Sequence, residues 1–377
     1  MPALRPEIDP DGLLEYSVVF TDRSLNHMSK TFQAVMQDIS STLKQVYNAE
    51  AVAIVPGGGS FGMEAVARQL AGGQKCLVIR NGWFSYRWSQ ILDMGRIAAE
   101  TVVMKARPSE NCSQPAYVPA PIDEVVDAIH QERPQIVFAP HVETSSGMIL
   151  PDDYIQSLAE AVHAVGGVLV LDCIASGTLW VDMQACGVDV LISAPQKGWS
   201  ASPCAALIMM NSAARKRVEA TTSSSFAADL RKWLHIMQAY ENGGHAYHAT
   251  LPTDSLARFH KAMQETEAFG FDEIRQAQWL LGGKARALLA EHGYKSVAAS
   301  GYEAPGVVVC YTDDADIHNG SKFLQQGLQI AAGVPLQCGE PEDFRTFRLG
   351  LFGLDKLQNI DRTLRHLENA LQAVTPP

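Results

Sequence analysis

A lysine, an acid and a glycine-rich turn stand where they could act together in amine chemistry. Lys197 lies within Ser-Ala-Pro-Gln-Lys-Gly-Trp (193–199), where small and apolar neighbours would desolvate its amine and make it nucleophilic. Asp172 follows the apolar run Gly-Val-Leu-Val-Leu (167–171). The turn Gly57–Ser60 precedes a helical pattern whose N-terminus would bind phosphate. These three features would meet if their strands were parallel, because ligands gather at the carboxyl ends of such strands.

Each of these residues has a plainer explanation when it is taken alone. Most lysines are solvated charges, an acid after a strand often caps the next helix, and a tight glycine turn needs no ligand. Together, however, they are what pyridoxal 5′-phosphate (PLP) requires: a Schiff-base lysine, a carboxylate for the pyridinium nitrogen and an anion site for the phosphate. The ordered set therefore predicts a PLP site.

The glycine turn also admits an interpretation of a different class. Residues 57–62 match the dinucleotide pattern G-x-G-x-x-G, and the next apolar run ends at Arg80, which could hold the extra phosphate of NADP. An NADP-binding oxidoreductase would leave Asp172 and Lys197 without a common purpose. A non-enzymatic binding protein on the same scaffold would leave the lysine and the acid unexplained.

The elements that must position these residues alternate between strands and helices. Short apolar runs predict strands at 51–55, 76–79, 136–139, 167–171, 188–193 and 205–210, and periodic patterns predict helices at 29–47, 61–70 and 152–164. This alternation is typical of a parallel sheet covered on both faces. After residue 255 the pattern loosens to helices at 256–268, 271–292 and 355–373 and strands near 306–311 and 346–349. We expect an arm at 1–25, a large domain at 26–255 and a smaller α+β domain at 256–377.

Composition narrows the class of protein further. A net charge of −11 over 377 residues argues against nucleic acid or an anionic membrane as a partner. No apolar run approaches the length of a membrane span, and Met1–Asp9 lacks the apolar stretch of a signal peptide. The seven cysteines include no CxxC pair and are expected to be reduced thiols, and no metal site is assigned. We therefore expect a cytoplasmic enzyme.

The sequence resembles the class V aminotransferases of PLP fold type I, nearest the alanine–glyoxylate and serine–pyruvate aminotransferases. The resemblance covers roughly residues 26–370. It implies an α/β fold whose large domain has a mainly parallel seven-stranded sheet, with a smaller C-terminal α+β domain. The motifs that carry it are GGGSFGMEA (57–65), NGWFSYR (81–87), HVETSSG (141–147), LDCIAS (171–176), SAPQK (193–197), YHATLPT (247–253) and FRLGLFG (347–353).

The resemblance also implies roles for individual residues of the cofactor site. Lys197 would form the Schiff base and transfer protons, and Asp172 would pair with the pyridinium nitrogen. Ile174 and Phe84 would pack on the two faces of the ring. The phosphate would be held by Gly58, Gly59, Ser60 and Gln196, joined by Tyr247 and Thr250 of the partner subunit in a homodimer.

Substrate binding and the overall reaction follow from the same resemblance. Ser145 would contact the ring oxygen or the substrate, and Arg348 would grip the substrate α-carboxylate through a bidentate pair. The implied reaction is a ping-pong transfer of an amino group from an alanine- or serine-like amino acid to glyoxylate or pyruvate through the Lys197 Schiff base.

The N-terminal segment departs from the family. The Gly-Pro-Gly-Pro opening that lines the substrate pocket is absent, and Asp9–Asn26 stands in its place. We expect this arm at the mouth of the active site, where Asp22 or Arg23 would shape a nonstandard specificity. An ordinary solvated arm is the alternative.

A cysteine desulfurase, or another PLP lyase, is the alternative within the same fold. Cys338 lies in a plausible mobile loop ten residues before Arg348 and would be its nucleophile. Against this interpretation, desulfurases usually have histidines where this sequence has Gln196 and Phe84.

Overall fold

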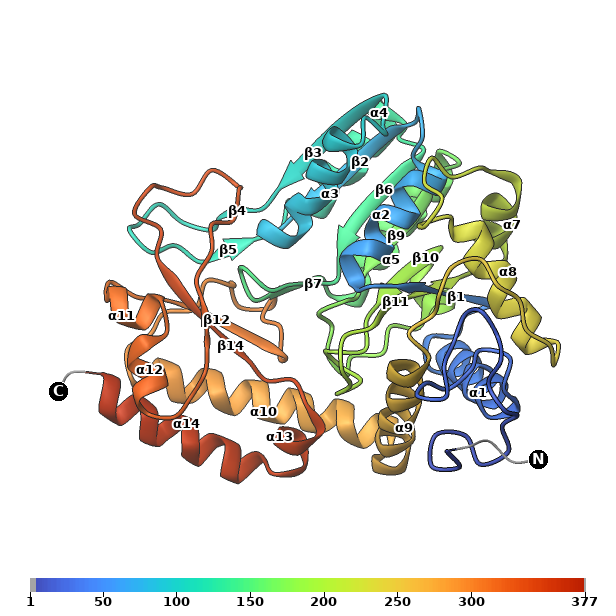
Figure 1. The fold of residues 1–377 in the computed structure, drawn as a ribbon. Helices are drawn as coiled ribbons and strands as arrows, with labels where there is room; N and C mark the ends of the chain where they lie inside the picture. Colours follow the sequence, from blue (N-terminus) through green and yellow to red (C-terminus); the bar gives the residue numbers. More distant parts are fainter. Residues whose placement is uncertain (1–4, 376–377) are drawn as a thin grey trace.

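A sheet of seven strands forms the centre of the computed structural model, which describes residues 5–375 (Figure 1). The strand order is β1-β11-β10-β9-β6-β2-β3, and only β11 runs antiparallel to its neighbours. Most of these strands are buried along their whole length, as their continuous apolar runs predict for strands covered on both faces. Their bounds are β1 (Ala51–Pro56), β2 (Lys75–Arg80), β3 (Glu100–Lys105), β6 (Ile136–Pro140), β9 (Val168–Asp172), β10 (Val190–Ser193) and β11 (Ala205–Met210).

Helices connect these strands and pack against them. Helix α2 lies on β10 and β11, α3 lies on β2 and β6, and α5 packs on β9 with α4 beside it. The predicted α/β fold with a mainly parallel sheet is confirmed. The helices of this part are α1 (Lys30–Tyr47), α2 (Gly59–Leu70), α3 (Trp83–Met94), α4 (Ile122–Glu132), α5 (Asp152–Ala164), α6 (Met183–Cys186), α7 (Ser212–Ala220) and α8 (Leu230–Glu241).

The C-terminal part has its own antiparallel sheet and its own core. Its strands β12 (Val307–Tyr311), β14 (Thr346–Gly350) and β13 (Ala331–Ala332) lie in that order. Helices α10 (Phe271–Glu291) and α14 (Ile360–Val374) run side by side beneath them in Figure 1. The remaining short elements are α11 (Ala315–His318), α12 (Ser321–Gln325), α13 (Leu354–Gln358) and the paired strands β4 (Arg107–Pro108) with β5 (Tyr117–Val118) and β7 (Val142–Glu143) with β8 (Met148–Ile149).

Helix α9 (Thr253–Phe269) joins the two parts. Its buried residues Leu256, Phe259 and Met263 belong to the core of the large sheet, whereas Ile274 of α10 begins the second core. The change of core therefore falls after Met263, later in the chain than the expected boundary at 255. The division into two domains stays a prediction.

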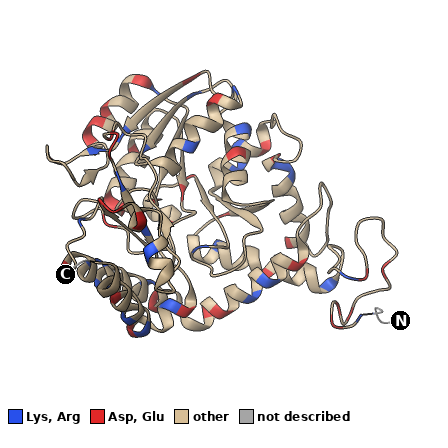
Figure 2. Ribbon diagram, turned by 60° about the vertical axis from the view of Figure 1, so that its left-hand side comes forward, with Lys and Arg blue, Asp and Glu red and all other residues tan. Residues whose placement is uncertain are grey.

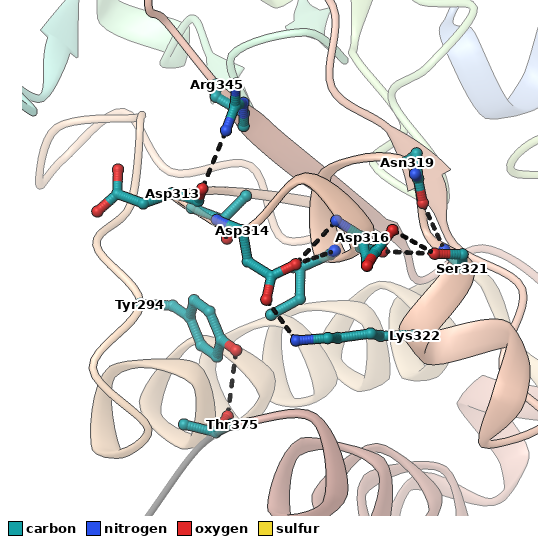
Figure 3. A network of polar contacts seen from close by, with 11 residues as sticks. Tyr294, Asp313, Asp314, Asp316, Asn319, Ser321, Lys322, Arg345 and Thr375 are labelled. Carbon is teal, nitrogen blue, oxygen red and sulfur yellow. Dashed lines mark hydrogen bonds and ion pairs between the residues drawn. The ribbon is translucent and has the colours of Figure 1, made fainter.

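A network of polar contacts surrounds α11, which packs beside α12 and β14 (Figure 3). Asp314 caps α11 by accepting hydrogen bonds from the backbone N–H groups of Asp316, at 2.8 Å, and Ile317, at 3.1 Å, and it also binds the Lys322 ammonium. Arg345 donates to the Asp313 carbonyl at 2.9 Å. We call residues 313–322 the α11 rim.

The N-terminal arm projects from the body of the molecule (Figure 2). It is tied down where the Leu25 N–H donates to Asp254 at 2.9 Å and the Thr31 hydroxyl donates to Asp9 at 3.0 Å. Residues 1–4 of the expected arm lie outside the described residues. Among residues 5–375, no helix has the length and apolar composition needed to cross a membrane.

Candidate active site

A cavity of about 360 Å³ opens between the carboxyl ends of the large sheet's strands and the small sheet. Both parts of the chain contribute walls, because α2, α3 and the loops after β9 and β10 lie on one side and β13 and β14 on the other. Eight of the residues singled out in the sequence line this cavity: Gly59, Ser60, Phe84, Asp172, Ile174, Gln196, Lys197 and Arg348. The strand topology therefore gathers segments that are up to about 290 residues apart in the chain.

The glycine turn brings the start of α2 against the cavity. Gly58 is the N-cap of α2, and a Cβ at Gly59 would overlap the Ile174 side chain, so only glycine lets the two segments approach. The first N–H groups of a helix have no partner within the helix and attract anions. Ser60 stands in this first turn, and its Oγ accepts a hydrogen bond from Arg87 Nη1 at 3.0 Å.

Asp172 ends β9 with its carboxylate buried at the cavity wall. Burial raises the pKa of Asp172 to about 7, and the Ile174 N–H, which donates to Oδ1 at 3.0 Å, opposes that shift. A buried carboxylate of this kind gains most from a cationic N–H partner, since such a partner restores the charged form. Asp172 is therefore suited to a protonated ring nitrogen.

Lys197 follows β10 and reaches the cavity with its Nζ 5.3 Å from the centre of the Phe352 ring. Burial lowers its pKa, and the positive charges of Arg348 and Arg87 lower it further. Within residues 5–375 Lys197 forms no ion pair with an acid that would reverse this effect. A neutral amine at this position is available as a nucleophile and as a base.

Arg348 enters the cavity from β14 of the small sheet. Its Nε donates to the Ala332 carbonyl at 2.8 Å, which fixes the direction of the side chain, and its Cζ lies 5.5 Å from the centre of the Phe84 ring. Among the described residues no carboxylate pairs with its guanidinium. Its remaining N–H groups can therefore hold a carboxylate of a ligand.

A buried glutamate fixes the start of α3 and with it Phe84. Glu143 accepts hydrogen bonds from the backbone N–H groups of Phe84, at 3.3 Å, and Ser85, at 2.8 Å, and from both hydroxyls of Ser85 and Ser145. A Cβ at Gly82 would collide with Ser145 Oγ, so glycine is required there. Glu143 was not among the residues assigned from the sequence.

Four of the assigned residues do not line this cavity, and neither does any residue of the described arm, 5–25, which we expected at its mouth. Gly58 lies just behind it, and Ser145 Oγ is engaged with the Trp83 N–H at 2.8 Å, while its neighbour Thr144 lines the wall instead. Tyr247 and Thr250 are exposed and hydrogen-bonded to each other at 3.1 Å, away from the cavity of their own chain.

The structure adds lining residues that the sequence analysis did not assign, chiefly Arg87, Thr144 and Phe352. All three lie within quoted motifs, so the motifs marked the right segments without showing which of their side chains face the cavity. For Arg87 a signal was available, because it stands one helical turn after Phe84 on the same helix.

The cavity fits PLP in chemistry as well as in size. Gln196 lines the cavity, its buried Oε1 has no partner within residues 5–375, and the amide N–H₂ group of the same side chain can donate to a phosphate oxygen. Phe84 and Ile174 supply apolar walls for an aromatic ring, and Ser60 with the start of α2 supplies an anion site. Asp172 and Lys197 provide the carboxylate and the amine.

The other interpretations find less support in the geometry. Arg80 is buried and donates to Ser89 Oγ at 2.8 Å and to the Gln337 carbonyl at 3.2 Å, so it does not face a nucleotide site. The Sγ of Cys338 lies 3.4 Å from the Arg80 carbonyl, and burial raises its pKa to about 12. A desulfurase nucleophile requires the opposite shift.

The chain is similar to known aminotransferases over most of its length. The chain is 26% identical over 365 residues to alanine–glyoxylate aminotransferase of Mus musculus, covering 93% of this chain and 83% of that protein. It is 25% identical over 323 residues to 2-aminoethylphosphonate–pyruvate transaminase of Vibrio vulnificus, covering 84% and 83%. The crystal structure of alanine–glyoxylate aminotransferase from Nostoc sp. superposes with a TM-score of 0.78 at 23% identity, covering 92% and 89%. The family model "Aminotransferase class-V" matches residues 13–348. The chain therefore belongs to the class V aminotransferases, enzymes that transfer amino groups with PLP as their cofactor.

Proposed function

We propose that this enzyme transfers the amino group of a small amino acid, alanine or serine, to glyoxylate or pyruvate in a ping-pong reaction. The observation that carries the proposal is that one cavity holds the Lys197 amine, whose pKa is lowered, and the Arg348 guanidinium, and that neither has an ionic partner among residues 5–375. The relatives support it, because those from mouse and Nostoc are named for alanine and glyoxylate and the one from Vibrio vulnificus for pyruvate.

The proposed division of labour assigns one task to each wall of the cavity. Lys197 anchors the cofactor covalently, Asp172 holds the proton on its ring nitrogen, and Phe84 and Ile174 enclose its ring. Gly59, Ser60 and Gln196 hold its phosphate. Bound PLP supplies the electron sink that stabilises negative charge at the substrate Cα.

The residues of this chain orient the substrate and move its proton. Arg348 binds the α-carboxylate and thereby fixes the Cα–H bond relative to Lys197. Lys197 Nζ, once free and neutral, would accept the proton from the substrate Cα and hold it for return. Asp172 stays charged beside the ring nitrogen throughout, because the protonated nitrogen compensates for its burial.

We also propose that two chains form a homodimer with shared active sites. Tyr247 and Thr250 are exposed in the single chain and would reach the phosphate of the other subunit. Large apolar side chains on α2 and α3 support a covered face, since Phe61 and Met94 are 60% and 86% exposed. All seven cysteines are free, which is consistent with a reducing, cytoplasmic compartment.

The test is an assay of the purified, PLP-loaded enzyme with L-alanine and glyoxylate, with glycine and pyruvate as the measured products. L-serine replaces alanine in a second assay, and L-cysteine in a third. Glycine formation with alanine or serine is the expected result. Release of sulfide from cysteine without amino transfer from any of the three would replace the proposal with desulfurase chemistry.

A further inference from the structure

The charges that line the cavity are unbalanced. Arg87, Lys197 and Arg348 face a single lining carboxylate. In the proposed function Arg348 takes the substrate carboxylate and Lys197 carries the cofactor, so Arg87 has no assigned anion. Within residues 5–375 Arg87 forms no ion pair. A second groove beside the cavity is lined by Arg87, Glu64 and Arg68, and on it Glu64 is bound to Arg68 at 2.7 Å.

The Arg87 guanidinium contacts two residues that the proposed function already uses. Its Nη1 donates to Ser60 Oγ at 3.0 Å, and its Cζ lies 4.6 Å from the centre of the Phe84 ring. Arg87 stands three residues after Phe84 on α3, so the helix itself holds the guanidinium and the ring together. One side chain therefore joins the phosphate end of the site to its ring-stacking wall.

We propose that Arg87 is a positioning residue for the cofactor phosphate and acts through the hydroxyl of Ser60; this inference rests on the proposed function. A serine hydroxyl has one hydrogen to donate and two lone pairs to accept with. Because Ser60 Oγ accepts from Arg87, its own hydrogen is directed to another acceptor, and the expected acceptor is a phosphate oxygen.

The experiment compares PLP with pyridoxal, which forms the same link to Lys197 and lacks the phosphate. Dissociation constants of both are measured by absorbance for wild type, Arg87→Gln, Ser60→Ala and the double variant. We expect Arg87→Gln to weaken PLP binding about 10-fold to 100-fold, the range of a hydrogen bond to a charged group, and to leave pyridoxal binding within about twofold. Since Arg87 acts through Ser60, the double variant should bind PLP about as well as Ser60→Ala alone.

Two further variants test whether the loss of PLP affinity is specific to the Arg87 guanidinium. Arg215→Gln is the matched control, because Arg215 is bound to Glu219 at 3.0 Å on α7 and neither residue lines the cavity; its ratio of PLP to pyridoxal affinity should equal that of wild type. Arg87→Lys keeps the charge if the glutamine variant fails to fold, and should still lose PLP affinity because an ammonium lacks the planar fork.

The inference is overturned if Arg87→Gln binds PLP as tightly as wild type, if pyridoxal affinity falls by the same factor, or if the losses of the two single variants multiply in full. Failure of the proposed function has a different signature. In that case wild type forms no glycine from glyoxylate with alanine or serine, whatever the PLP affinity of the Arg87 variants.

Discussion

Two lysines of this chain stand in opposite electrostatic settings. On the α11 rim, Lys322 binds the Asp314 carboxylate, and this hydrogen bond raises the pKa of Lys322 (Figure 3). In the cavity, Lys197 has two arginines for neighbours, and burial together with their charge lowers its pKa. The first lysine is held in its charged form and the second is pushed toward its neutral form.

The contrast separates charges that stabilise local structure from charges that are kept for a ligand. Rim charges are exposed and satisfied by each other, so each contributes little to stability and nothing to binding. Asp172, Lys197 and Arg348 are at least half-buried without an ionic partner in the described part of the chain, which destabilises the fold unless something else compensates. Perturbed groups of this kind gather at functional sites.

The largest expected effect comes from exchanging the two lysines for alanine in turn. Lys197→Ala should lower kcat for amino transfer by at least about 1,000-fold, because it removes both the covalent anchor and the base. Lys322→Ala is the matched control and should keep kcat within about twofold, with a small fall in melting temperature. Steady transamination by Lys197→Ala would show that Lys197 is neither the covalent anchor nor the base.

Asp172→Asn should have the next largest effect on turnover. A neutral amide cannot hold the proton on the ring nitrogen, so we expect kcat to fall about 100-fold or more while the cofactor remains bound. The measurement pairs kcat with cofactor occupancy by absorbance. Near-normal turnover in a fully loaded variant would remove Asp172 from this role.

The same substitution should stabilise the cofactor-free protein at high pH. The pKa of Asp172 is raised from 3.8 to about 7 by burial, so the folded state binds the proton more tightly than the unfolded state. The stability that this group contributes is therefore present below about pH 4 and is lost as the pH rises from 4 to 7. Asparagine does not ionise and avoids this loss.

Chemical denaturation at two pH values measures that difference. At pH 8 cofactor-free Asp172→Asn should exceed wild type by about 2–4 kcal/mol in free energy of unfolding, since each pKa unit corresponds to about 1.4 kcal/mol. At pH 4 the two proteins should differ little. A wild type that is the more stable of the two at pH 8 would mean that Asp172 is not destabilised by burial.

The smallest expected effect concerns the titration of Lys197. Two neighbouring arginines lower the pKa of Lys197, and Arg348 has the larger effect. Arg348→Met removes that charge, so the pH midpoint for covalent reaction of Lys197 with pyridoxal should move to higher pH. Arg345→Met is the control. Arg345 donates to the carbonyl of Asp313 on the α11 rim and does not line the cavity. An unchanged midpoint in the Arg348 variant would show that the charge of Arg348 does not lower the pKa of Lys197.

Much of the fold could be predicted from the sequence where burial of regularly spaced apolar residues determines the helix or strand. Helix α5 was expected at 152–164 and is found at Asp152–Ala164, because its apolar residues recur at helical spacing. Strand β3 was not predicted, since it is an edge strand with partly exposed residues and lacks a buried apolar run. Helix α8 was also not predicted, although Leu230, Trp233 and Met237 carry a helical spacing.

The site shows a similar limit on a finer scale. Lys197 and Asp172 could be assigned because each follows a buried strand in a distinctive motif. The choice between Thr144 and Ser145 could not, because it depends on the turn after β7 and on the glutamate that binds the Ser145 hydroxyl. Likewise, Leu256 and Phe259 of α9 join the large core through packing that no local pattern reveals.

The most direct test of the central claim is to locate the covalent bond between the cofactor and the chain. Purified protein is incubated with PLP, treated with borohydride, digested and analysed by mass spectrometry. We expect a visible absorption band that borohydride abolishes. The reduced adduct should lie on Lys197, with none on Lys322 beyond background labelling. A colourless protein that takes up no PLP, or an adduct spread over exposed lysines with Lys197 unmodified, would contradict it.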